Sequence, residues 1–212
     1  MLDINIIEKS YSNEVVLKDL KINIDKPGIY GIIGKNGQGK TTLFKCVLGL
    51  ESYKGKSVLN KEKISLQNTA FCPAEPLIYD ELTADEFCKF YCNLLDIPLY
   101  QKDKELFHLP KDKLIKNFST GMKKKVYINA VFQKKFSLYF LDEPFNGLDM
   151  ESNYILIKDL KRKAKDSIII VSSHIIEILY KNCNRIFLLK NKGVVEYNSE
   201  DFCNIQTDFN NI

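Results

Sequence analysis

Hydrophobic and polar residues alternate in the first part of the chain, in two runs around residues 4–7 and 17–24. A period of two is typical of antiparallel strands with one exposed face. Residues 29–33 are continuously apolar, which instead predicts a parallel strand buried on both faces. Further short strands are predicted at residues 55–60 and 64–66, and the alternating pattern ends at Pro73.

The hydrophobic period changes to about 3.6 residues after Leu82, which is typical of helices. Thr83 and Glu86 have the spacing of a capping box, and apolar residues follow at helical intervals. Ser119 precedes a second helical pattern that extends to residue 131, whereas residues 96–116 are polar and interrupted by Pro98 and Pro110. We therefore predict a mainly helical insertion at about residues 78–133.

An α/β pattern resumes after this insertion, with buried strands predicted at residues 137–141 and 167–172. Helices are predicted at 149–164 and 175–180, then a hairpin over Asn191-Lys192-Gly193, and a frayed Asn-rich tail after Glu200. The whole pattern predicts one α/β domain spanning residues 1–212. Its parts are a mostly parallel core sheet, an N-terminal antiparallel β subdomain and the small helical insertion.

The composition is that of an ordinary globular protein: 212 residues, 45% hydrophobic and 27% charged. A net charge of +4 is mild and does not by itself indicate a nucleic acid or a membrane surface as the partner. No apolar run approaches the roughly 20 residues of a membrane-spanning helix, and the first residues lack the pattern of a signal peptide. We expect a cytoplasmic protein whose membrane role would require a partner.

Six cysteines are scattered without a C-x-x-C pair. Cys88 and Cys92 lie one helical turn apart, which leaves half of a metal site as an alternative, but reduced structural thiols are favoured. Two groups of basic residues on predicted helices are interpreted as solvated helix faces rather than nucleic-acid patches. They are Lys123, Lys124, Lys125, Lys134 and Lys135, and Lys158, Lys161, Arg162, Lys163 and Lys165.

A glycine-rich segment with the spacing G-x-x-x-x-G-K-T lies between the apolar strand at 29–33 and a predicted helix ending at Gly49. Glycines let successive N–H groups turn toward one anion, and the helix N-terminus adds partial positive charge. The lysine can reach terminal phosphates, and the first threonine hydroxyl can hold Mg²⁺. The alternative is a surface turn, which would not need to lie between a buried strand and a helix. We therefore predict a nucleoside triphosphate site at Gly34, Lys35, Asn36, Gly37, Gln38, Gly39, Lys40, Thr41 and Thr42.

Two adjacent carboxylates, Asp142 and Glu143, end the strand predicted at 137–141. Asp142 is placed to join the Mg²⁺ shell, and Glu143 to polarise an attacking water; two acids capping a turn is the alternative. His174 ends another buried strand, where ligands of such sheets gather, so we predict a γ-phosphate contact. His108 has no such setting and is interpreted as structural.

Ser119-Thr120-Gly121-Met122 stands at the start of a predicted helix, far along the chain from the glycine-rich segment. Taken alone, it is a helix cap. A hydroxyl, a glycine and a free helix end also make an anion site. Two anion sites in one domain leave open the possibility that two copies enclose a nucleotide between them.

Five motifs in this order, at residues 34–42, 118–122, 141–144 and 147–149 and at His174, resemble the nucleotide-binding domain of an ABC transporter over nearly the whole chain. The resemblance implies an ATPase of the P-loop NTPase fold that uses ATP and Mg²⁺. Lys40 and Thr41 would hold phosphate and Mg²⁺, Asp142 would join the metal shell, and Glu143 would be the general base. His174 would be the switch histidine, and Tyr11 would stack on adenine. Ser119, Thr120, Gly121, Met122 and Asp149 would contact ATP bound to the partner subunit.

The chain departs from the family pattern at two motifs. The signature usually reads Leu-Ser-Gly-Gly-Gln, whereas Thr120 and Met122 stand at the first glycine and at the glutamine. This version is similar to those of bacterial exporters with separately encoded permeases. Ala74 stands where the family has a glutamine that touches Mg²⁺ and the lytic water, and Glu75 follows it.

The resemblance further implies two protein partners, a membrane permease and a second ATP-binding subunit, with a homodimer favoured and no nucleic acid. The protein would then lie on the inner face of the cell membrane. Two alternatives stay open: a soluble ABC-type ATPase of DNA maintenance or translation, and an ATP-binding module without catalysis. The first usually carries a coiled-coil insertion or a tandem domain, and only Ala74 favours the second. A P-loop GTPase is disfavoured because no Asn-Lys-x-Asp motif is present.

Overall fold

The computed structural model describes residues 1–97, 101 and 104–210 of the 212-residue chain. Its first sheet is antiparallel throughout and has the strand order β2-β1-β4-β5. Leu2, Ile4 and Ile6 alternate with more exposed residues along β1, as the period of two predicts. The strands are β1 (Leu2–Tyr11), β2 (Glu14–Ile24), β4 (Lys54–Leu59) and β5 (Glu62–Lys63).

The second sheet has six strands in the order β10-β9-β3-β8-β7-β6. All neighbours are parallel except the β9–β10 hairpin at one edge. The parallel arrangement brings the C-terminal ends of β3, β7 and β8 to one edge of the sheet. The strands are β3 (Gly28–Ile33), β6 (Ala70–Cys72), β7 (Leu138–Leu141), β8 (Ile168–Ser172), β9 (Arg185–Lys190) and β10 (Gly193–Asn198).

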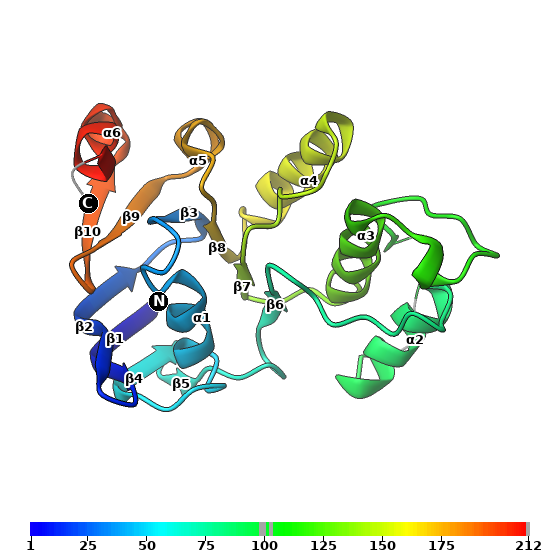
Figure 1. The fold of residues 1–212 in the computed structure, drawn as a ribbon, viewed down its shortest axis with the longest axis horizontal. Helices are drawn as coiled ribbons and strands as arrows, with labels where there is room; N and C mark the ends of the chain where they lie inside the picture. The colour runs from blue at the N-terminus through cyan, green and yellow to red at the C-terminus, as the bar shows by residue number, and fades with distance from the viewer. Residues whose placement is uncertain (98–100, 102–103, 211–212) are drawn as a thin grey trace.

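Helix α1 (Lys40–Val47) lies between the two sheets (Figure 1). Phe44 of this helix is fully buried and packs against Phe140 of β7, with the ring centroids 5.0 Å apart. The same core contains the inward residues of β1 and β2 together with Tyr30 and Ile32 of β3. The helix start is therefore held rigidly at the strand edge by packing on two sides.

Three helices cover the opposite face of the six-stranded sheet (Figure 1): α4 (Met150–Lys163), α5 (Ile176–Asn182) and α6 (Phe202–Asn210). A 3₁₀ turn, η3 (Ser199–Asp201), precedes α6. The prediction of a frayed tail after Glu200 is wrong. Phe202, Ile205 and Phe209 stand at helical spacing and pack on the sheet, and the Tyr197 hydroxyl donates a hydrogen bond to Asp208, so packing stabilises an amphipathic helix.

Between β6 and β7 the chain forms α2 (Ala84–Leu94), η2 (Ile115–Asn117) and α3 (Thr120–Val131), which lie beside the sheets (Figure 1). The predicted capping box of Thr83 and Glu86 is present at the start of α2. Helices α2 and α3 share a separate apolar cluster that includes Phe87 and Val126. The boundaries of this insertion at 78–133, and its place in a single domain 1–212, stay predictions; Pro98 lies outside the described residues.

Two further predictions from the pattern are wrong. No strand forms at residues 64–66, because Ile64 is buried under the first sheet and Asn68 closes a turn by accepting the Ser65 N–H at 2.9 Å. Lys124 and Lys163 do not lie on solvated helix faces, since their side chains are only 4% and 10% exposed. Within residues 1–97, 101 and 104–210, no helix has the length and apolar character needed to cross a bilayer.

Candidate functional site

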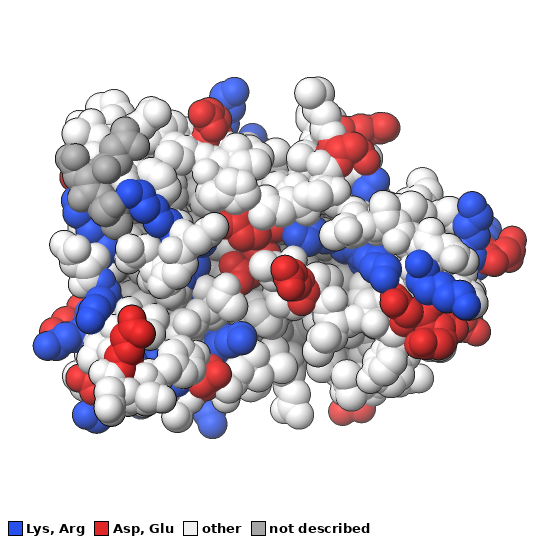
Figure 2. Space-filling view, in the orientation of Figure 1, with Lys and Arg blue, Asp and Glu red and all other residues white. Residues whose placement is uncertain are grey.

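The loop between β3 and α1 encloses a pocket of about 300 Å³ at the C-terminal edge of the six-stranded sheet. The predicted phosphate loop and both predicted carboxylates contribute to its wall, as the convergence of parallel strands requires. Its lining consists of Lys35, Asn36, Gly37, Gly39, Lys40, Thr41, Thr42, Ala74, Asp142 and Glu143. In the space-filling view, acidic and basic atoms meet near the middle of this face of the molecule (Figure 2).

The loop needs glycine at the position before α1. Gly39 has a φ of 92°, in the left-handed region, and a Cβ there would lie 2.9 Å from Leu17 Cδ2 and 3.1 Å from Val16 Cγ1. Gly37 is also left-handed, with a φ of 85°. The N-terminus of α1 is not capped by a side chain, so its N–H groups are open to an anion in the pocket.

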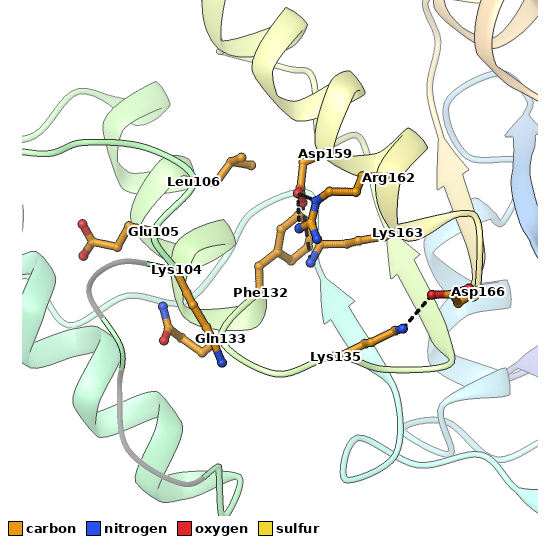
Figure 3. Close-up of a pocket in the computed structure, with 10 residues that line it drawn as sticks. All are labelled: Lys104, Glu105, Leu106, Phe132, Gln133, Lys135, Asp159, Arg162, Lys163 and Asp166. Atoms are coloured by element: carbon orange, nitrogen blue, oxygen red, sulfur yellow. Dashed lines mark hydrogen bonds and ion pairs between the residues drawn. The ribbon is translucent and has the colours of Figure 1, made fainter.

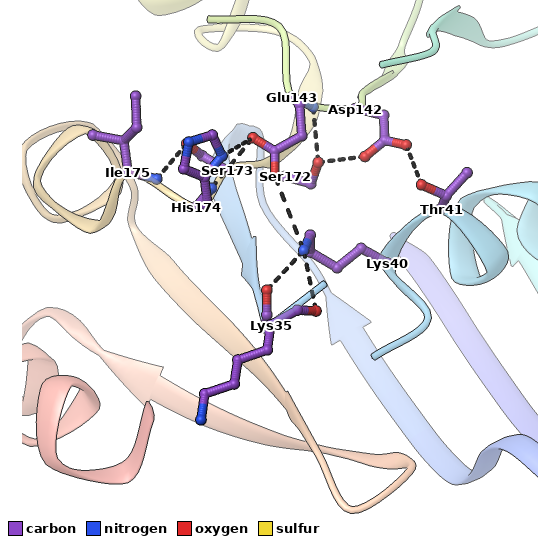
Figure 4. Close-up of polar contacts among 10 residues, drawn as sticks. Lys35, Lys40, Thr41, Asp142, Glu143, Ser172, Ser173, His174 and Ile175 are labelled. Atoms are coloured by element: carbon purple, nitrogen blue, oxygen red, sulfur yellow. Dashed lines mark hydrogen bonds and ion pairs between the residues drawn. The ribbon is translucent and has the colours of Figure 1, made fainter. Parts of the chain in front are cut away.

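Lys40 supplies a cation at the floor of the pocket. Its side chain is 8% exposed, and Nζ donates to the Gly34 carbonyl oxygen at 2.7 Å and to that of Lys35 at 3.4 Å. Glu143 Oε1 lies 4.0 Å from the same nitrogen (Figure 4). An ammonium group held by uncharged carbonyls can turn to phosphate oxygens, which accept stronger, charge-assisted hydrogen bonds.

Asp142 joins the loop to the neighbouring strand. Thr41 Oγ1 donates to its Oδ2 at 2.6 Å, and Ser172 Oγ donates to its Oδ1 at 2.5 Å (Figure 4). The carboxylate is 1% exposed, so both of its oxygens are oriented by neighbours rather than by water. A hydroxyl and a carboxylate at this distance form the oxygen donor set that Mg²⁺ prefers, and these side chains therefore fit that metal.

Glu143 links the pocket to the histidine at the end of β8. His174 Nδ1 lies 2.9 Å from Glu143 Oε2, and the His174 backbone N–H donates to the same oxygen at 3.3 Å. The Glu143 side chain is 12% exposed and that of His174 is 54% exposed, so the carboxylate is nearly enclosed and the imidazole faces solvent. The structure thus brings the predicted residues Lys40, Asp142, Glu143 and His174 together.

Two residues that the sequence reasoning did not assign to the site also contact it. Lys124 of α3 donates from Nζ to the Glu143 carbonyl oxygen at 2.8 Å, and Ser172 Oγ accepts the Glu143 N–H at 2.9 Å. Burial lowers the pKa of Lys124, and the neighbouring Cys72, Glu143 and Asp142 act in the opposite direction. The sequence did contain a signal for Lys124. It lies four residues before the apolar Ile128, which is buried, and residues at this spacing share one face of a helix.

The segment Ser119–Met122 does not line the pocket and instead begins α3. The Ser119 hydroxyl accepts the Met122 N–H at 3.2 Å as an N-cap, and Ser119 and Thr120 are exposed. Gly121 packs directly on the segment that precedes α4, because a Cβ there would lie 2.2 Å from the Gly147 carbonyl oxygen. These two predicted motifs are neighbours within one chain.

Asp149 belongs to this second group. Its carboxylate accepts the Ser152 N–H at 2.8 Å and pairs with Lys125 at 2.9 Å. The hydrogen bond from the Ser152 backbone, together with Lys125, holds the pKa of Asp149 well below its usual range. The residue is therefore an ionised N-cap of α4 that also connects α4 to α3.

Tyr11 lies at the end of β1 and is 40% exposed. The Lys9 ammonium lies 4.2 Å from the centre of its ring, and Lys9 itself pairs with Glu51 at 2.9 Å. Tyr11 is not part of the lining of the phosphate-loop pocket, whereas Ala74 is. The assigned roles of both positions stay predictions.

A larger cavity, of about 450 Å³, lies between the end of α3 and the end of α4 (Figure 3). Three of its cations are already paired: Arg162 and Lys163 with Asp159, and Lys135 with Asp166. Lys163 also lies 4.6 Å from the centre of the Phe132 ring. These three cations are occupied by carboxylates, whereas the Lys40 ammonium of the smaller pocket donates its two hydrogen bonds to uncharged carbonyls, so size does not identify the site.

The chain is similar to known proteins in sequence and in fold. The family model described as "ABC transporter" matches residues 17–146. A lantibiotic transport ATP-binding protein, SrtF of Streptococcus pyogenes, is 30% identical over 100% of this chain and 96% of its own length. The ABC transporter ATP-binding protein YtrB of Bacillus subtilis is 25% identical over 99% of this chain and 77% of its own length. A solved structure described as the ATP binding subunit of an ABC transporter superposes with a TM-score of 0.83 at 26% identity, covering 99% of this chain and 94% of its own.

Proposed function

Because the chain belongs to the ABC transporter family, we propose that it binds and hydrolyses ATP to drive transport through a separate membrane permease. The observation that carries this proposal is that Lys40 and Glu143 line one pocket, with His174 in contact with the Glu143 carboxylate. A lysine at a helix N-terminus and a carboxylate able to position the attacking water recur in sites of phosphoryl transfer to water.

Binding rests on the phosphate loop. The open N–H groups of Gly37–Thr42 and the Lys40 ammonium would surround the phosphates of ATP, and Tyr11 would stack on adenine. Thr41 and Asp142 would hold Mg²⁺ through their adjacent oxygens. When bound, Mg²⁺ supplies positive charge that offsets the phosphate oxygens.

Hydrolysis rests on Glu143. Its carboxylate, nearly enclosed and directed to the pocket by His174, would accept a proton from the water that attacks the γ-phosphate. Lys40 would stabilise the negative charge that spreads over the transferring phosphoryl oxygens. His174, which is exposed to solvent, would contact the γ-phosphate and keep the carboxylate oriented.

A second ATP-binding subunit would complete the site. Ser119, Thr120, Gly121 and Met122 begin a helix whose exposed N-terminus is a ready anion site, yet they are absent from the lining of the pocket in their own chain. In a dimer of identical chains this segment, with Asp149, would close over the ATP bound by the partner subunit. Each pocket would then be completed in trans.

The permease would bind a surface of exposed apolar side chains near the Ala74 segment. Leu77 and Tyr79 precede α2 and are 92% and 56% exposed, and Phe90 packs edge-on against Tyr79 with the centroids 5.1 Å apart. Exposed apolar groups gathered in this way are typical of interaction surfaces. The subunit would lie at the cytoplasmic face of the membrane, and the similarity of its signature to bacterial exporters supports export.

The test is Glu143→Gln, which keeps the shape of the side chain and removes the base. We expect ATP binding to remain and the hydrolysis rate to fall roughly 100- to 10,000-fold, the contribution of a general base. Phosphate release and equilibrium binding of a fluorescent ATP analogue measure the two quantities. Near-normal turnover in this variant would remove Glu143 as the base, and co-purification with ribosomes or DNA instead of a polytopic membrane protein would contradict the transport role.

A further inference from the structure

Glu143 has an unusual backbone conformation for a residue with a side chain. Its φ is 47°, in the left-handed region, where residues other than glycine are uncommon. Such a conformation persists only when surrounding groups hold it, and it is often found at functional sites. The structure holds it from both sides, because Ser172 Oγ accepts the Glu143 N–H at 2.9 Å and Lys124 Nζ donates to the Glu143 carbonyl oxygen at 2.8 Å.

Lys124 comes from a different part of the molecule than the rest of the site. It lies on α3, five residues after the N-cap Ser119, whereas the other groups lie on or next to the six-stranded sheet. Its side chain is 4% exposed, and lysine is rarely buried to this degree without a partner. The remaining contact of the Glu143 carbonyl oxygen, the Asn146 N–H at 3.3 Å, is longer.

We propose that Lys124 is a positioning residue for ATP hydrolysis: by holding the Glu143 carbonyl oxygen, it sets the direction in which the Glu143 carboxylate points. The proposal rests on the proposed function. With the N–H held by Ser172 and the carbonyl oxygen held by Lys124, both flanking peptide groups are oriented. The side chain then leaves the backbone toward Lys40 and His174. Helix α3 also begins with the exposed segment at Ser119. A displacement of this helix would therefore move Lys124 and, through its hydrogen bond to the Glu143 carbonyl oxygen, change the direction of the carboxylate.

The test compares Lys124→Met with the unsubstituted full-length chain. Methionine fills most of the buried space and removes the donor, so the carboxylate loses its alignment while the phosphate loop is untouched. We expect kcat for ATP hydrolysis to fall about 10- to 100-fold, as when groups that orient a reactive ligand are removed. The KM for ATP and the affinity for a fluorescent ATP analogue should stay at the wild-type values, and Lys124→Arg, which keeps a donor, should recover part of kcat.

Lys123→Met is the matched control. Lys123 is the preceding residue of the same helix and pairs with Asp80 at 2.6 Å. Its substitution removes the same charge from α3 without a contact to Glu143, so kcat should stay at the wild-type value. If Lys124→Met does not fold, judged by its melting transition, Ser172→Ala tests the same peptide from the other side. It is measured at saturating Mg²⁺, because Ser172 Oγ also donates to Asp142 Oδ1. Its control is Ser167→Ala, at the start of β8, whose buried hydroxyl donates to the Phe136 carbonyl oxygen at 2.8 Å.

The outcomes separate the two proposals. Wild-type kcat in Lys124→Met, or an equal loss in Lys123→Met, overturns the positioning role. A parallel loss of ATP affinity and kcat, without recovery in Lys124→Arg, also overturns it, because the lysine would then only support the fold. If the unsubstituted chain and Lys124→Met both hydrolyse ATP at the same rate, only the positioning role is overturned and the proposed function stands. An inactive unsubstituted chain that also fails to bind ATP overturns both.

Discussion

Two helix starts in this molecule carry similar residues but lie in different surroundings. Helix α1 follows Gly39, which supplies no side-chain cap, and its N-terminus faces a pocket walled by Lys40, Asp142 and Glu143 of the same chain. Helix α3 is capped by the hydroxyl of Ser119, and its N-terminus is exposed. The comparison teaches that a helix N-terminus becomes a binding site only through the groups that surround it. The first start has those groups within one chain, whereas the second needs a partner.

Among substitutions at the two helix starts, the largest effect is expected from Lys40→Ala, which removes the cation of the first site. Two charge-assisted hydrogen bonds to phosphate would be lost, so the Kd for ATP should rise about 100-fold. Isothermal titration with ATP and Mg²⁺ measures this, with Lys45→Ala as the control because Lys45 is an exposed residue of the same helix. Unchanged ATP binding in Lys40→Ala would refute the role of the lysine and remove the contrast between the two helix starts.

A smaller effect is expected from Gly121→Ala, which alters the second helix start. The new Cβ would lie 2.2 Å from the Gly147 carbonyl oxygen, so the start of α3 and the segment before α4 must separate. Overpacking of this kind costs about 1–3 kcal/mol, and ATP-dependent dimerisation should weaken about tenfold. Light scattering of the Glu143→Gln variant with ATP measures the dimer. If dimerisation stays at the wild-type level and the monomer instead loses affinity for ATP, the start of α3 acts on the ATP site of its own chain and not on that of a partner.

The smallest effect is expected from Ser119→Ala, which removes the cap of α3. The lost hydrogen bond to the Met122 N–H should reduce the free energy of unfolding by about 1 kcal/mol, measured by urea denaturation. Thr83→Ala, in the capping box of α2, is the matched control with a similar stability loss. Only Ser119→Ala should also weaken ATP-dependent dimerisation. An equal effect of both variants on the dimer would mean that the Ser119 hydroxyl acts as a cap alone.

Local patterns were sufficient for most of the fold. The change from a period of two to one of 3.6 placed the antiparallel sheet, α2 and α3, because each pattern is decided by which face of an element is buried. The prediction failed at α6, where Phe202, Ile205 and Phe209 stand at helical spacing among polar residues and pack against the sheet. It also failed at residues 64–66, where one buried isoleucine does not make a strand.

The sequence by itself determined the composition of the phosphate loop, the two carboxylates and the histidine, since their chemistry depends on residue type and short spacing. Only the tertiary structure decided that Lys124 contacts the Glu143 carbonyl oxygen and that Gly121 packs on Gly147. Both contacts join segments about 20 residues or more apart, and their partners are backbone atoms. Every residue has the same backbone carbonyl group. The pattern of side chains along the sequence therefore does not indicate which carbonyl a distant lysine or glycine will contact.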